Sequence, residues 1–220
     1  MKKAFIFTML MHIPSILVYK MQIKTISQLL KEGADLQKLL DFLMETESQS
    51  FVSELQEKRE TYFNRINTFP EYVFLFFDDE NNYFGYFCGE LLNKIPETAE
   101  EIAFDHTPCN TSDGHVFYIS SFAINKKYRK MHLGKIMFTK VFQLLQKDSK
   151  IKEMILLVNE KWESAIRIYE GCGFKIINTF ENVFPPEPLI VDEKGNEEND
   201  NNKLHSDSNY TKGLLMRFIS

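Results

Sequence analysis

The chain has 220 residues and a formal net charge of −5, which fits one domain of ordinary size with short extensions. Hydrophobic residues make up 44% and charged residues 26%, and this composition excludes disordered and collagenous chains. Residues 187–207 hold seven acidic and two basic side chains, so the rest of the chain is close to neutral. A neutral body excludes a nucleic-acid partner held by bulk electrostatics. The three cysteines have no C-x-x-C spacing, so we expect reduced thiols and no metal site.

Residues 1–20 are an N-terminal apolar extension that allows three interpretations. Lys2 and Lys3 precede an apolar run that resembles a secretory signal, but His12 and Pro14 interrupt it and no small-residue cleavage site follows. At about 1.5 Å per residue, the run is too short for a hydrocarbon core of roughly 30 Å. In the third interpretation the domain starts at Met21, and residues 1–20 are an extension or a misassigned start. We expect a cytoplasmic protein with no stable membrane span, and a membrane-directed segment is the alternative.

Residues 21–220 predict a single mixed α/β domain when the elements are taken in chain order. Hydrophobic periodicity predicts helices at about 35–43, 50–66, 133–147 and 163–172. Alternating and aromatic-rich runs predict strands at 22–26, 72–77, 83–91, 115–124, 153–158, 174–180 and 214–219. Residues 93–114 predict a loop with a short helix. Residues 185–208, rich in proline, asparagine and acids, predict a flexible acidic insertion. This order predicts a central, partly antiparallel sheet flanked by helices.

The turn between the predicted strand at 115–124 and the next helix is the most informative stretch. A loop that opens a helix directs several backbone N–H groups at one place, and the helix dipole adds partial positive charge there. Gly134 removes a side chain where a ligand could approach the backbone. Five basic residues surround the turn: Lys126, Lys127, Arg129, Lys130 and Lys135. They predict a site for a phosphate-bearing ligand, with a solvated basic turn as the alternative.

A second motif runs from Ala165 to Phe174, where a short helix is expected to stop at Gly173 before a strand. Tyr169 lies on the turn before that stop. The two stretches, in this order, resemble the GNAT superfamily of acyl-CoA-dependent N-acyltransferases. Arg129-x-x-His132-x-Gly134 is similar to that family's Gln/Arg-x-x-Gly-x-Gly/Ala pyrophosphate loop. The stretch 165–174 is similar to its Ala-x-x-hydrophobic-Tyr-Glu-x-x-Gly-Phe element.

The resemblance implies a GNAT-like fold that binds acetyl-CoA, without a metal, in a gap between the strands at 115–124 and 153–158. Backbone groups of Phe122, Ala123 and Ile124 would pair with the pantetheine amides. Tyr169 would act as the general acid for the leaving thiolate. Backbone N–H groups of the loop would hold the pyrophosphate: Arg129, Lys130, Met131, His132, Leu133, Gly134 and Lys135. This chain departs from the family at two positions, because His132 replaces the first loop glycine and Trp162 replaces a frequent asparagine.

The stretch from Phe69 to Tyr169 looks closest to the arylalkylamine-N-acetyltransferase-like branch, on the entry Phe69-Pro70-Glu71. Vertebrate members of that branch carry a His-x-His pair where this chain has Tyr118 and Ser120, so their deprotonation mechanism is not transferred. The remaining candidates for the base are Glu90, His106 and His115, each with an ordinary polar role as the alternative, and Ser120 is kept beside Glu90 as a catalytic candidate.

These implications predict transfer of the acetyl group of acetyl-CoA to a primary amine of a small molecule or peptide, by direct attack. A degenerate acyl-CoA-binding or sensor domain without turnover is the alternative. A membrane-tethered interaction protein defined by residues 1–20 is a third hypothesis. A homodimer is left open.

Overall fold

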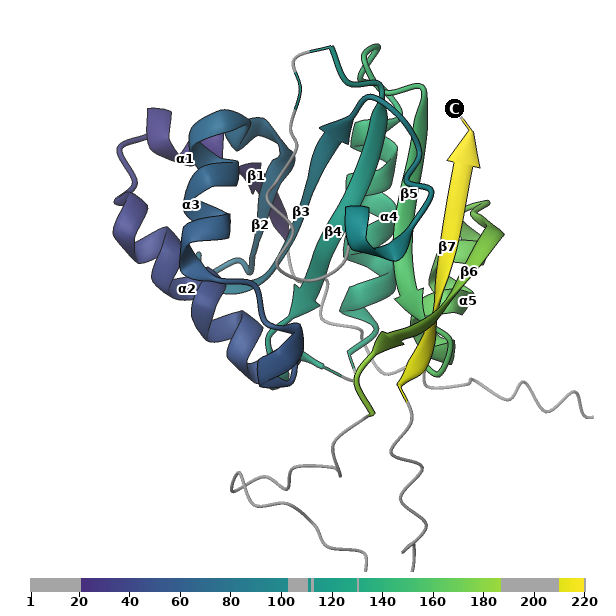
Figure 1. The fold of residues 1–220 in the computed structure, drawn as a ribbon. Coiled ribbons are helices and arrows are strands. Elements are labelled where there is room, and N and C mark those ends of the chain that lie inside the picture. The colour runs from purple at the N-terminus through teal and green to yellow at the C-terminus, as the bar shows by residue number, and fades with distance from the viewer. Residues whose placement is uncertain (1–20, 103–110, 112, 130, 187–209, 220) are drawn as a thin grey trace, which may run out of the picture.

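The computed structural model describes residues 21–102, 111, 113–129, 131–186 and 210–219. One seven-stranded sheet in the order β1-β2-β3-β4-β5-β7-β6 carries helices on both faces (Figure 1). The neighbours β4 and β5 are parallel, and the other neighbouring pairs are antiparallel. The predicted mixed α/β fold is therefore confirmed. The extension at residues 1–20 and most of the predicted insertion lie outside the described residues.

The strands are β1 Gln22–Thr25, β2 Val73–Phe77, β3 Tyr83–Leu92, β4 Val116–Ile124, β5 Glu153–Asn159, β6 Lys175–Phe184 and β7 Thr211–Ile219. The α-helices are α1 Ile26–Lys31, α2 Leu36–Ser50, α3 Arg59–Thr68, α4 Leu133–Leu145 and α5 Glu163–Gly171. Helix α2 begins where predicted, because the Asp35 carboxylate accepts a 2.8 Å hydrogen bond from the Gln37 amide. Helix α5 ends as predicted before Gly173, which takes a φ of 93° that favours glycine.

Two helical predictions for the first half need correction. Helix α1 was not predicted, although Thr25 and Gln28 form a capping box around its first turn. The single helix expected over 50–66 is wrong, because α2 ends at Ser50 and α3 begins only at Arg59. The segment between them is extended apart from one short turn at Ser53–Leu55. Phe51 and Leu55, whose spacing resembled a helix face, line a pocket instead.

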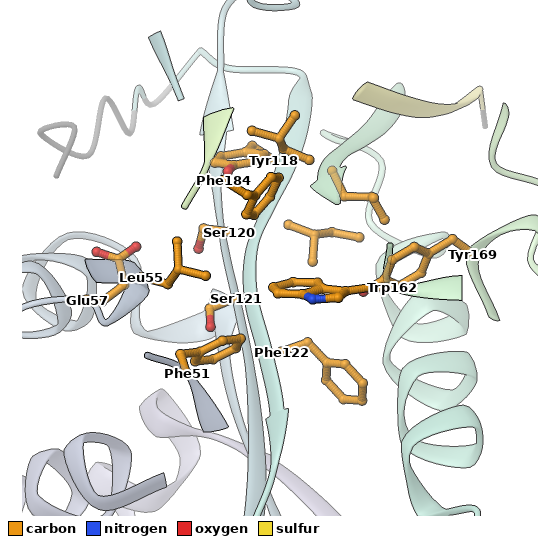
Figure 2. A pocket seen from close by; sticks show the side chains of 13 residues that line it. Phe51, Leu55, Glu57, Tyr118, Ser120, Ser121, Phe122, Trp162, Tyr169 and Phe184 are labelled. Atoms are coloured by element: carbon orange, nitrogen blue, oxygen red, sulfur yellow. The ribbon is translucent and has the colours of Figure 1, made fainter. Parts of the chain in front are cut away.

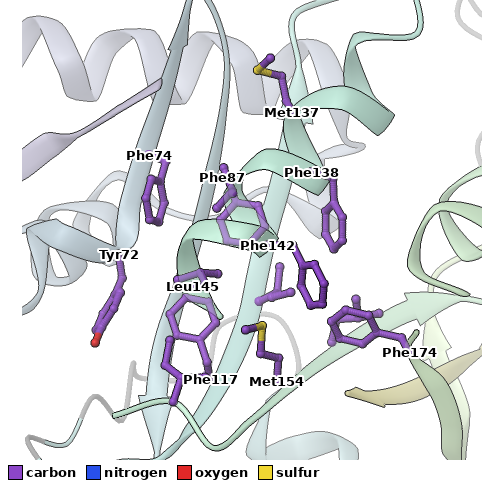
Figure 3. Packing of buried hydrophobic residues seen from close by; sticks show 14 of the residues in the cluster. Tyr72, Phe74, Phe87, Phe117, Met137, Phe138, Phe142, Leu145, Met154 and Phe174 are labelled. Carbon is purple, nitrogen blue, oxygen red and sulfur yellow. The ribbon is translucent and has the colours of Figure 1, made fainter. Parts of the chain in front are cut away.

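Apolar side chains fill both faces of the sheet. On one face, α4 packs its buried side over strands β2 to β5 and β7 in a cluster rich in phenylalanine, including Phe87, Phe138, Phe142 and Phe174 (Figure 3). Helices α1, α2 and α3 cover the other face, around Leu39, Leu43, Tyr62 and Tyr86 among others. Burial on two sides explains why β2 is a continuous apolar run.

Strands β4 and β5 separate partway along their length. Their register runs from Val116 opposite Glu153 to Ile119 opposite Leu156 and then stops. Beyond that point β5 continues to pair with β7, while β4 continues to pair with β3. In the described chain, residues 120–124 of β4 therefore have a strand neighbour on one side only. This leaves a gap in the middle of the sheet.

Candidate active site

A pocket lies where β4 and β5 separate (Figure 2). Its wall combines residues of β4 and β5, of the segment after α2, and of α5. The described lining residues are Phe51, Leu55, Glu57, Tyr118, Ile119, Ser120, Ser121, Phe122, Leu156, Leu157, Trp162, Tyr169 and Phe184. The pocket thus falls between the two strands where the resemblance implied a gap.

A β-bulge presents two consecutive serines to this pocket. Cys88 lies opposite Ser121 and Gly89 opposite Ile119, so Ser120 is an extra residue on β4. A bulge interrupts the alternation of side chains between the two faces of a strand, and Ser120 and Ser121 both line the pocket. The Ser120 hydroxyl lies 3.3 Å from the Cys88 carbonyl oxygen, to which it can donate. Ser120, a catalytic candidate from sequence, therefore lies at the site.

Tyr169 reaches the pocket from α5. Its ring packs on Phe138 at 4.8 Å between centroids, and none of the described residues forms a hydrogen bond with its hydroxyl. Burial raises the pKa of the Tyr169 hydroxyl above its usual value, because the phenolate would lose solvation. The phenol is therefore protonated at neutral pH and has a proton to donate.

Trp162 forms an aromatic part of the pocket where a polar asparagine was the expectation. It is the residue before α5, and its ring lies 5.4 Å from that of Phe184 and 6.3 Å from that of Phe51. These contacts join α5, β6 and the segment after α2. The replacement removes one amide from the pocket and adds apolar surface.

The predicted phosphate site is the N-terminus of α4. Its first N–H groups have no acceptor within the helix, and the side chain of the N-cap residue, His132, does not cap them. His132 takes the left-handed conformation, with φ of 57°, which a glycine would adopt without strain. A Cβ on Gly134 would have only Phe122 Cε1 nearby, at 4.0 Å, so the backbone is open there. Lys130 lies outside the described residues.

Arg129 is engaged within the protein. Its guanidinium donates to the carbonyl oxygens of Ile124 and Gln49, both at 3.0 Å, and to the Ser50 hydroxyl at 2.8 Å. Its backbone N–H donates to the Lys126 carbonyl. These bonds tie the loop to the C-terminal end of α2, so Arg129 positions the loop. The N–H groups available to bind an anion therefore belong to the residues that follow Arg129 in the chain.

Glu90 lies beneath the pocket wall in a buried ion pair. It is 0% exposed and lies 3.2 Å from Arg65, which is 1% exposed and also pairs with Glu57 at 2.9 Å. Glu57, in the segment between α2 and α3, was not predicted as a site residue, because no local motif marks it. Among the described lining residues, Glu57 is the one with a carboxylate. His115 is exposed and precedes β4, whereas His106 lies outside the described residues.

The described residues contain no cluster of three or more histidine, cysteine, aspartate or glutamate side chains suited to a metal ion. Their helices are also too short or too polar to cross a membrane.

Comparisons with known proteins agree with the fold. The family model described as "Acetyltransferase (GNAT) family" matches residues 38–174. A probable N-acetyltransferase of Drosophila melanogaster, san, is 28% identical over 75 residues, which cover 34% of this chain and 41% of that protein. This match therefore spans less than half of the relative's length.

Solved structures with a similar fold are distant in sequence. The loading GNATL domain of CurA from Lyngbya majuscula superposes with a TM-score of 0.64 at 13% identity, over 90% of this chain and 97% of that one. The ribosomal-protein-S18-alanine N-acetyltransferase of Escherichia coli gives 0.59 at 12% identity, over 90% and 93%. At these identities the likeness establishes the fold alone.

Proposed function

The chain belongs to the GNAT family of acetyltransferases, and from that membership we propose that it transfers the acetyl group of acetyl-CoA to a primary amine of a small molecule or peptide. The observation that carries this proposal is the gap between β4 and β5, which has Tyr169 on one side and the unpaired edge of β4 on the other. A gap of this kind accepts an extended ligand with amides, because a strand edge offers N–H and C=O groups.

For the donor, residues 122–124 and the start of α4 are the proposed binding elements. Phe122, Ala123 and Ile124 would meet the pantetheine amides, since this part of β4 has no partner on the β5 side. The open N–H groups from Met131 to Lys135 would meet the pyrophosphate. The absence of a side chain at Gly134 supports close approach. Acetyl-CoA would thus lie along β4 with its thioester near Ser120 and Tyr169.

For the chemistry, the acceptor must reach the thioester as a neutral amine. An alkylamine with a pKa near ~10 is about 0.1% neutral at pH 7, so loss of one proton precedes attack. The amine nitrogen then bonds to the thioester carbon as the C–S bond breaks. Tyr169 would donate a proton to the leaving sulfur, which resembles a cysteine thiolate with a pKa of about 8.5.

The charge at the acceptor side of the pocket favours a cationic substrate. Arg65 is paired with two carboxylates, Glu57 and Glu90, so the three side chains together carry an excess negative charge. Glu57 is the member that reaches the pocket. An ammonium group approaching from this side would meet a carboxylate, while Phe51, Leu55 and Trp162 would contact apolar parts of the same molecule.

The proposal is tested by thiol release from acetyl-CoA with a panel of small amines and amino-terminal peptides. We expect at least one primary amine to be acetylated, as confirmed by the mass of the product. Propionyl- and isobutyryl-CoA belong in the same panel, because a GNAT-like decarboxylase of similar fold, GphF, was solved with isobutyryl-CoA. Tight binding of acetyl-CoA without thiol release across the panel would instead support the non-catalytic acyl-CoA-binding alternative.

A further inference from the structure

A carboxyl group is buried directly behind the acceptor side of the pocket. Glu47, on the last turns of α2, is 0% exposed and faces the sheet between α3 and β3. It follows Leu40 and Leu43 on the same side of the helix, at the spacing of the apolar stripe. Burying an ionisable side chain in such a stripe is costly unless the group is neutral, or is paired and hydrogen-bonded.

Hydroxyl groups surround one of its two oxygens. Glu47 Oε1 accepts hydrogen bonds from the hydroxyls of Tyr62 and Tyr86, and from Ser121 Oγ at 3.2 Å. Ser121 Oγ is also 2.7 Å from the Tyr86 hydroxyl. The second oxygen, Oε2, is buried and has no partner among the described residues. The cluster therefore does not satisfy the carboxyl fully, as a purely structural network would.

Ser121 connects this carboxyl to the pocket. Its hydroxyl touches Glu47 on one side, and the residue lines the pocket beside Ser120 on the other. Figure 2 shows Ser121 and Glu57 on the same side of β4, opposite Tyr169. An ammonium group held near Glu57 would thus lie on the side from which Ser121 is reached, and Tyr169 would approach the thioester from the other side.

The electrostatics around Glu47 suit a group that takes up a proton. Burial raises the pKa of its carboxyl, with a smaller contribution in the same direction from Glu57, and the hydroxyl bonds from Tyr62, Tyr86 and Ser121 oppose the shift. The titratable groups that face this cluster come from several elements: Tyr62 and Arg65 of α3, Tyr86 and Cys88 of β3, and Glu57 before α3. Arg65, the one cation among them, is paired with Glu57 and Glu90. Among the described residues, Glu47 therefore has no direct ion-pair partner.

We propose that Glu47 accepts the proton of the acceptor ammonium through the hydroxyl of Ser121, within the amine acetylation proposed above. One N–H bond of the ammonium breaks as Ser121 Oγ gains that proton, and the Ser121 O–H bond breaks as Glu47 Oε1 gains the other. The neutral amine then forms the C–N bond and the C–S bond breaks. The second proton of the nitrogen passes to the sulfur by way of Tyr169. Glu47 returns its proton through Ser121 to water once the product has left.

The pH dependence of kcat/KM distinguishes this relay from a structural role. With the relay, the wild-type rate for the ammonium form rises as Glu47 deprotonates and then levels off below the pKa of the amine. Without it, only the neutral fraction of the amine reacts, so kcat/KM should rise about tenfold per pH unit up to about pH 10. We expect Glu47→Gln to show this continuous rise and to lose about 10²–10⁴-fold at pH 7.

Ser121→Ala is the second variant, because it breaks the path while leaving the bonds of Tyr62 and Tyr86 to Glu47 in place. It should reproduce the profile of Glu47→Gln, and Ser121→Thr, which keeps a hydroxyl, should restore the plateau. Glu45→Gln is the matched control, since Glu45 is exposed on the same helix and bonds to Gln49. It should keep the wild-type profile.

The outcomes separate the relay from the reaction on which it depends. Suppose that the wild-type protein acetylates an amine and that the plateau persists in both Glu47→Gln and Ser121→Ala. This result overturns the relay and leaves the acetylation standing. Should Glu47→Gln fail to fold, the profile of Ser121→Ala decides by itself. Wild-type protein that releases no thiol with any amine overturns the acetylation and the relay together.

Discussion

Replacing Gly134 by alanine tests the binding of acetyl-CoA without disturbing the fold. Apart from the local backbone, the nearest described atom to the Cβ of Gly134→Ala would be Phe122 Cε1 at 4.0 Å, an ordinary contact. Gly134 is the second residue of α4, and alanine favours a helix over glycine by up to about 1 kcal/mol. The free energy of unfolding should therefore stay the same or rise slightly.

The same methyl occupies the space through which a pyrophosphate would reach the first turn of α4. Displacing the ligand from one N–H loses a hydrogen bond to a charged group, worth about 1.5–3 kcal/mol. The Kd for acetyl-CoA should therefore rise about 10- to 150-fold. Gly134→Glu adds a negative charge, and two like charges about 4 Å apart repel by about 4 kcal/mol near a protein surface. This repulsion alone predicts a loss of nearly 1000-fold, in addition to the loss caused by the bulk of the side chain.

Titration calorimetry with acetyl-CoA measures both effects, with thermal unfolding of the same samples as the check on folding. Gly171→Ala is the matched control, because Gly171 ends α5 and a Cβ there would meet nothing within 4 Å. It should leave the affinity unchanged. A folded Gly134→Glu protein with wild-type affinity would refute the assignment of this helix start to the pyrophosphate.

Substitutions at three further residues test other parts of the site. Tyr169→Phe keeps the ring packing and removes the proton donor, so kcat should fall about 10²–10⁴-fold with acetyl-CoA affinity unchanged; equal kcat values, with chemistry limiting the rate, would assign the ring a packing role. Arg65→Met removes the cation that pairs with the buried Glu90 and the partly buried Glu57, and it should lower the free energy of unfolding by about 3–5 kcal/mol; a stability within 1 kcal/mol of wild type would contradict the ion-pair reasoning. His132→Gly removes a left-handed strain of about 1–2 kcal/mol, so denaturant titration should show it to be at least as stable as wild type and His132→Val to be less stable; the reverse order would show that His132 is not strained.

Periodicity predicted the long elements well because they bury one continuous face. Helix α4 repeats apolar residues at helical spacing across its whole length, and its predicted start at Leu133 is the observed one. The helix predicted over residues 50–66 was wrong because tertiary contacts decide the conformation around residue 55. Phe51 and Leu55 stand four residues apart, as on a helix, yet both turn into a pocket that the distant β4 and α5 complete. No local pattern contains that information.

The sequence predicted only those parts of the candidate site that belong to its two motifs. The gap beside β4, the open start of α4 and the place of Tyr169 follow from short stretches of sequence. Glu47 and Glu57 lie more than 60 residues before Ser121 in the chain, and only the fold brings them to the same site. One signal for Glu47 was present, because it interrupts the apolar stripe that Leu40 and Leu43 begin.

The separation of β4 from β5 also divides the sheet into two halves that follow one another in the chain. Strands β1 to β4 form the first half and β5 to β7 the second, and the register between them runs only from Val116 opposite Glu153 to Ile119 opposite Leu156. Helix α4 spans the seam, where Phe138 and its neighbours pack against both halves. The angle between the halves is therefore set by the volume of that packed layer. Substitutions on the buried side of α4 would widen or narrow the cleft from behind, without altering any atom that a substrate touches.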